Sequence, residues 1–153
     1  MPARTVLTIG NFDGVHLGHL ALIRAAAEAA GASGRIVGMV FEPHPSTVLR
    51  PQAVPPRLTT LADRTRLLLE AGVNTVVPIE QTPELLGTSP EAFVAAVVRD
   101  QQPDVMVEGS NFRFGRDRAG DVAELSRLGK LQGFEVIVVP PVSSVLGDLS
   151  VVP

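Results

Sequence analysis

Several residue types are absent or nearly absent from the chain, and each absence removes a class of function. The sequence contains no cysteine, tryptophan or tyrosine. Without cysteine there can be no disulfide, no thiolate catalysis and no Cys-ligated zinc or iron–sulfur site. Lysine occurs once, as Lys130, and 13 Lys and Arg against 16 Asp and Glu leave a formal charge of −3. This charge does not favour the basic surface that neutralises nucleic-acid phosphates.

Long apolar runs are also missing. No stretch approaches the roughly 18–20 apolar residues that cross a bilayer. The N-terminal residues run directly into a short apolar segment, without the pattern of a signal peptide. We therefore expect a cytoplasmic protein that binds neither membranes nor nucleic acid.

What the sequence does contain is enough apolar material for one globular domain. Hydrophobic residues make up 45% of the 153 residues and charged residues 19%, which is typical of a chain that buries a core. Short Val- and Ile-rich runs alternate with helical stretches, which indicates an α/β fold of the Rossmann type, a parallel five-stranded sheet with helices on both faces. We expect strands at 6–9, 36–41, 73–79, 105–107 and 134–139, and helices at 17–30, 60–71, 90–100 and 122–128.

In such a fold the ligand site lies at the carboxyl ends of the strands. Three unusual segments follow strands of the predicted sheet, at 10–19, 41–45 and 109–120. We expect these three segments to converge on one site.

The first segment suits a phosphate. Gly10, Gly14 and Gly18 allow the backbone to approach a ligand closely, and the helix that follows offers unpaired N–H groups. His16 and His19 lie three residues apart on one face of its first turn and would stabilise negative charge. Two alternatives stay open: the two histidines could be part of a metal site, or the turn could be purely structural. A Walker A phosphate-binding loop is excluded because its Lys is missing.

The same residues resemble a known family. The pattern Gly10-x-Phe12-Asp13-Gly14-x-His16-x-Gly18-His19 is similar to the signature of the HxGH nucleotidyltransferases. The particular residues of this motif resemble those of the FMN adenylyltransferase domain of the bacterial bifunctional riboflavin kinase/FAD synthetase family. Three further segments resemble that family in order and spacing, namely Phe41-Glu42-Pro43-His44-Pro45, Arg57-Leu58-Thr59-Thr60, and Asn111-Phe112-Arg113-Phe114-Gly115 running into Arg118-Ala119-Gly120-Asp121.

The resemblance implies a Rossmann-like nucleotidyltransferase fold and the transfer of AMP from ATP to FMN, giving FAD and pyrophosphate with the help of Mg²⁺. By resemblance, His16 and His19 contact the ATP phosphates and are catalytic with Asn111, which would hold the reacting phosphates or the metal. The nucleotide side would comprise Gly10, Asn11, Phe12, Asp13 and Gly18, and the flavin side Pro43, His44, Pro45 and Phe114.

The aromatic residues of the third segment leave one point open. Phe112 and Phe114 alternate, so one is expected to face the core and the other the cleft. The sequence does not say which. Phe93, on a helix with Val94 and Val97, is expected in the core.

The chain departs from the family pattern after the fifth strand. The family continues there into I-S-S-T-x-x-R, whereas residues 143–153 contain no Thr, Lys or Arg. We therefore expect one domain over residues 1–153 with a divergent or truncated tail and no riboflavin kinase domain. The alternatives are a catalytically impaired flavin- or ATP-binding fragment, another HxGH adenylyl- or cytidylyltransferase, or a fragment from a truncated reading frame.

Overall fold

A computed structural model describes residues 3–13, 16–42, 60–143 and 150–151. Its main sheet has five parallel strands in the order β3-β2-β1-β4-β5. They are β1 (Thr5–Gly10), β2 (Arg35–Glu42), β3 (Thr75–Glu80), β4 (Val105–Gly109) and β5 (Glu135–Val139). A separate antiparallel pair joins β6 (Val142–Ser143) to β7 (Ser150–Val151). All five predicted strands and the α/β class are confirmed.

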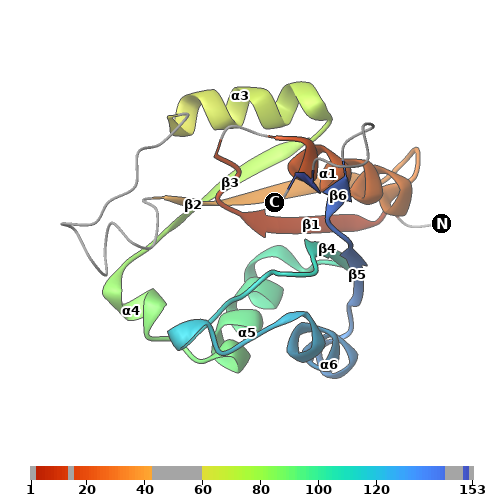
Figure 1. Cartoon of the computed structure of the whole chain (residues 1–153). Helices are drawn as coiled ribbons and strands as arrows, with labels where there is room; N and C mark the ends of the chain where they lie inside the picture. Colours follow the sequence, from red (N-terminus) through yellow and green to blue (C-terminus); the bar gives the residue numbers. More distant parts are fainter. Residues whose placement is uncertain (1–2, 14–15, 43–59, 144–149, 152–153) are drawn as a thin grey trace.

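Helices cover both faces of the sheet (Figure 1). The elements are α1 (Leu17–Ala30), α3 (Leu61–Ala71), α4 (Pro83–Leu86), α5 (Pro90–Gln101), the 3₁₀ turn η2 (Arg116–Arg118) and α6 (Val122–Gln132). Helices α1 and α3 contribute to a core that includes Val6 of β1, and α5 and α6 contribute to a second core that includes Leu7 of the same strand. Because alternate residues of β1 point to opposite faces, its continuous apolar run fills both cores.

The helices begin where the sequence predicts, because a polar side chain caps each one. Thr60, Ser89 and Asp121 accept a hydrogen bond from the backbone N–H three residues on, at 3.1, 3.2 and 2.9 Å. Each bond satisfies one of the unpaired N–H groups of the first turn.

The predicted end of the last helix is wrong. We expected α6 to end at 128, but it continues to Gln132 and ends at Gly133, whose φ of 95° is left-handed. Gly129 lies inside the helix, where a Cβ would approach the carbonyl oxygen of Phe134 to 2.6 Å, so the close packing requires glycine. Gly129 thus permits close packing within the helix, and the left-handed Gly133 ends it.

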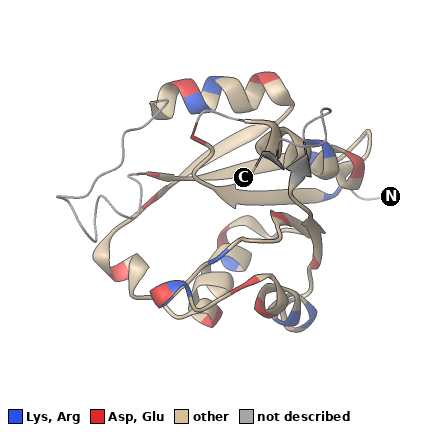
Figure 2. Ribbon diagram, viewed as in Figure 1, with Lys and Arg blue, Asp and Glu red and all other residues tan. Residues whose placement is uncertain are grey.

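The outer surfaces of the helices carry charges of both signs, as Figure 2 shows for α3. On that helix Arg66 lies 3.8 Å from Asp63 and 3.4 Å from Glu70. Within the described ranges, no helix is long and apolar enough to cross a membrane.

The sheet opens between β1 and β4. These strands share only two ladder pairs, Val6 with Val105 and Leu7 with Met106, whereas β1 and β2 share six. Beyond these pairs the side chain of Glu108, 1% exposed, accepts a hydrogen bond from the Ile9 N–H at 2.9 Å. The Thr8 hydroxyl lies 3.5 Å from its other oxygen. Glu108 thus bridges the two strands where the backbone ladder stops.

Burial raises the pKa of the Glu108 carboxyl well above its ordinary value, and its hydrogen bonds to Ile9 and Thr8 only partly oppose this. Among the described residues no Arg or Lys hydrogen-bonds it. Folding therefore favours the neutral form of this carboxyl relative to the unfolded chain.

This burial predicts a pH dependence of stability. The folded pKa of Glu108 lies above the unfolded one, so its contribution to the free energy of unfolding is full below the unfolded pKa. That contribution is lost as pH rises towards the folded pKa, at up to about 1.4 kcal/mol per pH unit. Glu108→Gln, which keeps an acceptor for Ile9, should flatten this loss. Urea unfolding at several pH values measures it, and parallel pH profiles for the two proteins would contradict the prediction.

Candidate active site

The carboxyl ends of the strands lie on the left in Figure 1, at the same edge as the connection from β1 to α1. From β1 the sheet extends through β2 and β3 to one side and through β4 and β5 to the other. Strand β1 is therefore at the topological switch point, where α/β sheets bind ligands.

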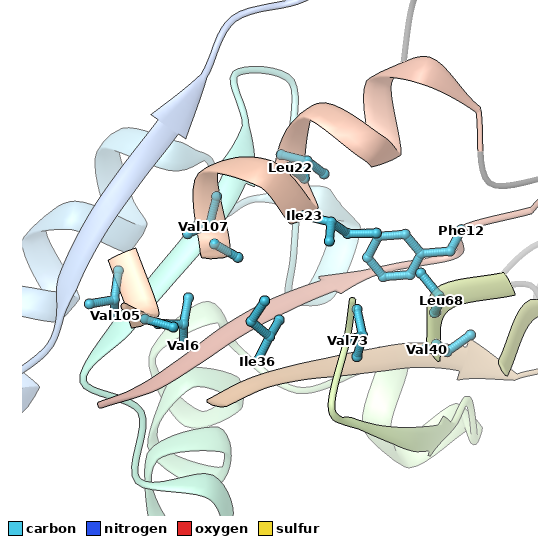
Figure 3. Packing of buried hydrophobic residues seen from close by; sticks show 12 residues of the cluster. Val6, Phe12, Leu22, Ile23, Ile36, Val40, Leu68, Val73, Val105 and Val107 are labelled. Carbon is cyan, nitrogen blue, oxygen red and sulfur yellow. The ribbon is translucent and has the colours of Figure 1, made fainter. Parts of the chain in front are cut away.

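The turn after β1 is shaped by a buried aromatic ring. Phe12 has a left-handed φ of 53° and is 1% exposed. Figure 3 shows its ring lying between α1 and α3, beside Ile23 and Leu68. Since the side chain belongs to the core, only the backbone of Phe12 remains for the nucleotide-side role predicted for it.

His16 and His19 close the first turn of α1 by reciprocal hydrogen bonds. His16 is the N-cap, and its Nδ1 accepts from the Gly18 N–H at 3.1 Å. The His16 N–H donates to Nδ1 of His19 at 3.2 Å. The two rings stack with centroids 3.7 Å apart, and His19 meets the edge of Phe12 at 5.1 Å.

These bonds assign the tautomer of both imidazoles. A ring nitrogen that accepts a hydrogen bond carries a lone pair, so in the neutral ring the proton is on the other nitrogen, Nε2. Burial lowers the pKa of His19 to about 4; the proximity of His16 lowers it further and Asp13 partly opposes the shift. Burial also lowers the pKa of His16. At neutral pH the pair therefore presents two uncharged Nε2–H donors.

The predicted nucleotide-side residues extend from the end of β1 to the first turn of α1. Gly10 ends β1, and Gly18 is buried in the first turn of α1. The side-chain oxygen of Asn11 is buried and has no hydrogen-bond partner among the described residues. An acceptor in this condition suits a ligand that brings its own donor.

The segment after β4 brings Asn111 to the same edge. Asn111 is exposed and follows the last residue of β4 by two positions. A Cβ on Gly109 would lie 3.2 Å from the Asn111 side-chain oxygen, so the two residues are in close contact. Because residue 109 is a glycine, the Asn111 amide, which is predicted to hold phosphate or metal, can lie close to the backbone there.

Of Phe112 and Phe114, it is Phe114 that faces the core. Phe114 is 4% exposed and packs on Phe93, with ring centroids 5.9 Å apart. Phe112 is only partly buried and stacks on Phe114 at 5.6 Å. The expected flavin-side role of Phe114 is therefore not supported by its burial. Phe93 lies in the core, as predicted.

A close approach fixes Phe114 in place. Its backbone exchanges two hydrogen bonds with Gly120, of 3.1 and 2.9 Å. A Cβ at Gly120 would approach the Phe114 ring to 2.6 Å, so only glycine fits beneath it. The other predicted flavin-side residues, Pro43, His44 and Pro45, lie outside the described residues.

Sequence reasoning missed two buried polar side chains at this edge, Arg64 and Gln81. Arg64, in the first turn of α3, is 1% exposed and hydrogen-bonds the backbone of Asn11. Gln81 follows β3, and its side-chain oxygen is buried without a partner among the described residues. No signal separates such residues from solvent-exposed ones in a single sequence, because polar side chains on helices and loops usually face water.

Comparison with known proteins finds similar chains. A family model described as FAD synthetase matches residues 1–150. The bifunctional riboflavin kinase/FMN adenylyltransferase of Escherichia coli K12 is 35% identical over 133 residues, which cover 86% of this chain and 42% of that protein. A FAD synthetase of Listeria monocytogenes is 34% identical over 140 residues, covering 91% of this chain and 57% of that protein.

One solved structure is similar over nearly the whole chain. A crystal structure titled as a macrolide-efflux protein from Streptococcus pneumoniae superposes with a TM-score of 0.83 at 29% identity. The superposition covers 96% of this chain and 48% of the chain in that crystal structure. The present chain thus spans between 42% and 57% of the length of these three proteins.

The hydrogen bonds at His16 and His19 predict a spectroscopic signature. In ¹⁵N imidazole spectra at pH 7, both residues should show a protonated Nε2 and a bare Nδ1. On acidification His19 should titrate with a midpoint of about 4, because protonation of Nδ1 breaks its bond to the His16 N–H. Single His→Gln variants assign the signals. A His19 midpoint near the ordinary 6.5 would contradict the geometry.

Proposed function

Because the chain belongs to the FAD synthetase family, we propose that it transfers the adenylyl group of ATP to the phosphate of FMN, forming FAD and releasing pyrophosphate. The observation that carries this proposal is the stacked pair His16 and His19. Two fixed, uncharged Nε2–H donors stand at the N-terminus of α1, at the switch point of the sheet.

The proposed reaction is an in-line displacement. A phosphate oxygen of FMN attacks the α-phosphorus of ATP, and the bond from that phosphorus to the bridging oxygen breaks, so that pyrophosphate leaves. The two imidazoles donate to phosphate oxygens that gain charge in the transition state, and the first N–H groups of α1 add their dipole. Positioning and charge stabilisation suffice because no covalent intermediate with the chain is formed.

The remaining contacts are proposals of the same kind. Asn111 would donate to, or position, the reacting phosphates from the far side of the opening between β1 and β4. Asn11 and Gly10 would line the nucleotide side. Pro43, His44 and Pro45 stay predicted flavin contacts, and for aromatic contact the partly exposed Phe112 has better support than Phe114.

Mg²⁺ fits this site only as a companion of the nucleotide. Among the described residues no group of three or more His, Asp or Glu could hold a metal ion. Mg²⁺ is commonly bound by one or two protein oxygens together with substrate phosphates, and the exposed Asn111 offers such an oxygen. When bound, the ion would neutralise charge on the triphosphate. The expected cytoplasmic location also stays a prediction.

The test is FMN-dependent formation of FAD and pyrophosphate from ATP and Mg²⁺ by the purified chain. His19→Asn keeps an acceptor for the His16 N–H but removes the Nε2 donor. It should therefore retain the melting temperature while the rate falls by about 10²–10³, the usual loss on removing a transition-state donor. Leu20→Ala, at an exposed position of α1, is the matched control and should keep full activity.

Other outcomes separate the alternatives. Binding of ATP or FMN by calorimetry without pyrophosphate release would indicate an impaired binding protein. Release that depends on a different phosphate acceptor would indicate another nucleotidyltransferase. A His19→Asn variant with the wild-type rate would remove the proposed role of the imidazole.

A further inference from the structure

Arg64 is almost completely buried although it carries a charge. It is 1% exposed and lies in the first turn of α3, one helical turn before the core residue Leu68. Long charged side chains are rarely buried unless they are paired and hydrogen-bonded. The groups that Arg64 contacts therefore indicate its role in the structure.

The guanidinium of Arg64 contacts both the turn after β1 and the end of β2. Its Nη1 donates to the backbone oxygen of Asn11 at 2.8 Å and lies 3.3 Å from that of Phe41. Its Nη2 pairs with the Glu42 carboxylate, and its Nε lies 3.4 Å from the backbone oxygen of Thr60. The planar fork of an arginine can direct several N–H groups at fixed angles, which suits this set of acceptors.

These contacts begin where the backbone ladder ends. The last pair between β1 and β2 is Gly10 with Val40. Asn11 follows β1 and Phe41 is the next residue of β2, and Nη1 of Arg64 contacts the backbone oxygens of both. Arg64 thus fastens the turn after β1 to the end of β2.

The fastened turn leads directly to the imidazole pair. Phe12, which follows Asn11, has a left-handed backbone and packs its ring against Leu68 of the helix that carries Arg64. The same ring meets His19 at 5.1 Å. The position of Asn11 therefore sets that of Phe12, and the Phe12 ring packs against His19.

We propose that Arg64 is a positioning residue that holds the nucleotide-side turn and the end of β2 in fixed relation, without touching substrate. Glu42 is the last residue of β2, so the guanidinium also anchors the carboxyl end of that strand. This inference rests on the proposed adenylyl transfer, and displacement of the imidazoles by roughly 1 Å would lower the rate about 10²-fold.

The kinetic test compares variants at position 64 at a temperature where all are folded. Arg64→Met keeps the aliphatic stem but no donor, and its kcat should fall about 10²-fold. Arg64→Lys keeps the charge but lacks the planar fork, so it should recover only part of that loss. Arg66→Met, on the exposed face of the same helix, is the control and should match the wild type. A purely structural role would lower the melting temperature of Arg64→Met but leave its kcat unchanged.

A second measurement does not need catalysis. In Arg64→Met the ¹⁵N imidazole signals of His19 should shift and its titration midpoint should rise towards 6.5, whereas Arg66→Met should leave both unchanged. If the wild type shows no FMN-dependent turnover, the proposed function fails and this measurement alone decides the role of Arg64. If Arg64→Met does not fold, Arg64→Gln takes its place. Wild-type kcat and unshifted His19 signals in a folded variant without the guanidinium would overturn the proposal.

Discussion

The parting of β1 from β4 after two ladder pairs is the constraint on which the rest of the site depends. It frees the end of the central strand from one neighbour, so that the chain can turn out of the sheet towards α1. The backbone groups exposed by the parting need partners, because an unpaired buried N–H costs about as much as a lost hydrogen bond. Glu108 supplies one for the Ile9 N–H on the β4 side. On the β2 side, where the ladder ends at Gly10, Arg64 donates to the Asn11 carbonyl oxygen. Two buried polar side chains thus replace the ladder around the turn that carries the imidazoles.

The imidazoles themselves are held by the helix that they cap. Most helices use a hydroxyl or carboxylate at the N-cap, but in α1 a histidine occupies that position and a second histidine returns the bond from N3. In this arrangement both Nδ1 atoms accept hydrogen bonds from the backbone, and both Nε2–H groups remain as donors. The cap therefore serves folding and binding at once, since it fixes tautomer, ring orientation and charge before any ligand arrives. Preorganised donors of this kind stabilise developing charge without reorganisation during the reaction.

Much of this could be predicted from the sequence because it rests on local patterns. The strands are Val- and Ile-rich runs, the helices start at Thr60, Ser89 and Asp121, and the motif around His16 marks the turn after the first strand. The patterns failed where tertiary contacts decided the outcome. Gly129 serves packing against Phe134 rather than ending α6, and Phe114 faces the core while Phe112 lies nearer the surface. The short helix α4 went unpredicted, and nothing local distinguishes the buried Arg64 from the exposed Arg66 two residues later. Pro43, His44 and Pro45 remain predictions.

The most direct test of this account is a crystal structure of the chain with a non-hydrolysable ATP analogue and Mg²⁺. The account predicts phosphate oxygens within about 3 Å of Nε2 of both His16 and His19. Both Nδ1 atoms should still be engaged with the first turn of α1, and the guanidinium of Arg64 should still contact Asn11 without touching the nucleotide. A triphosphate bound elsewhere, or an imidazole turned so that Nδ1 faces the phosphate, would contradict it.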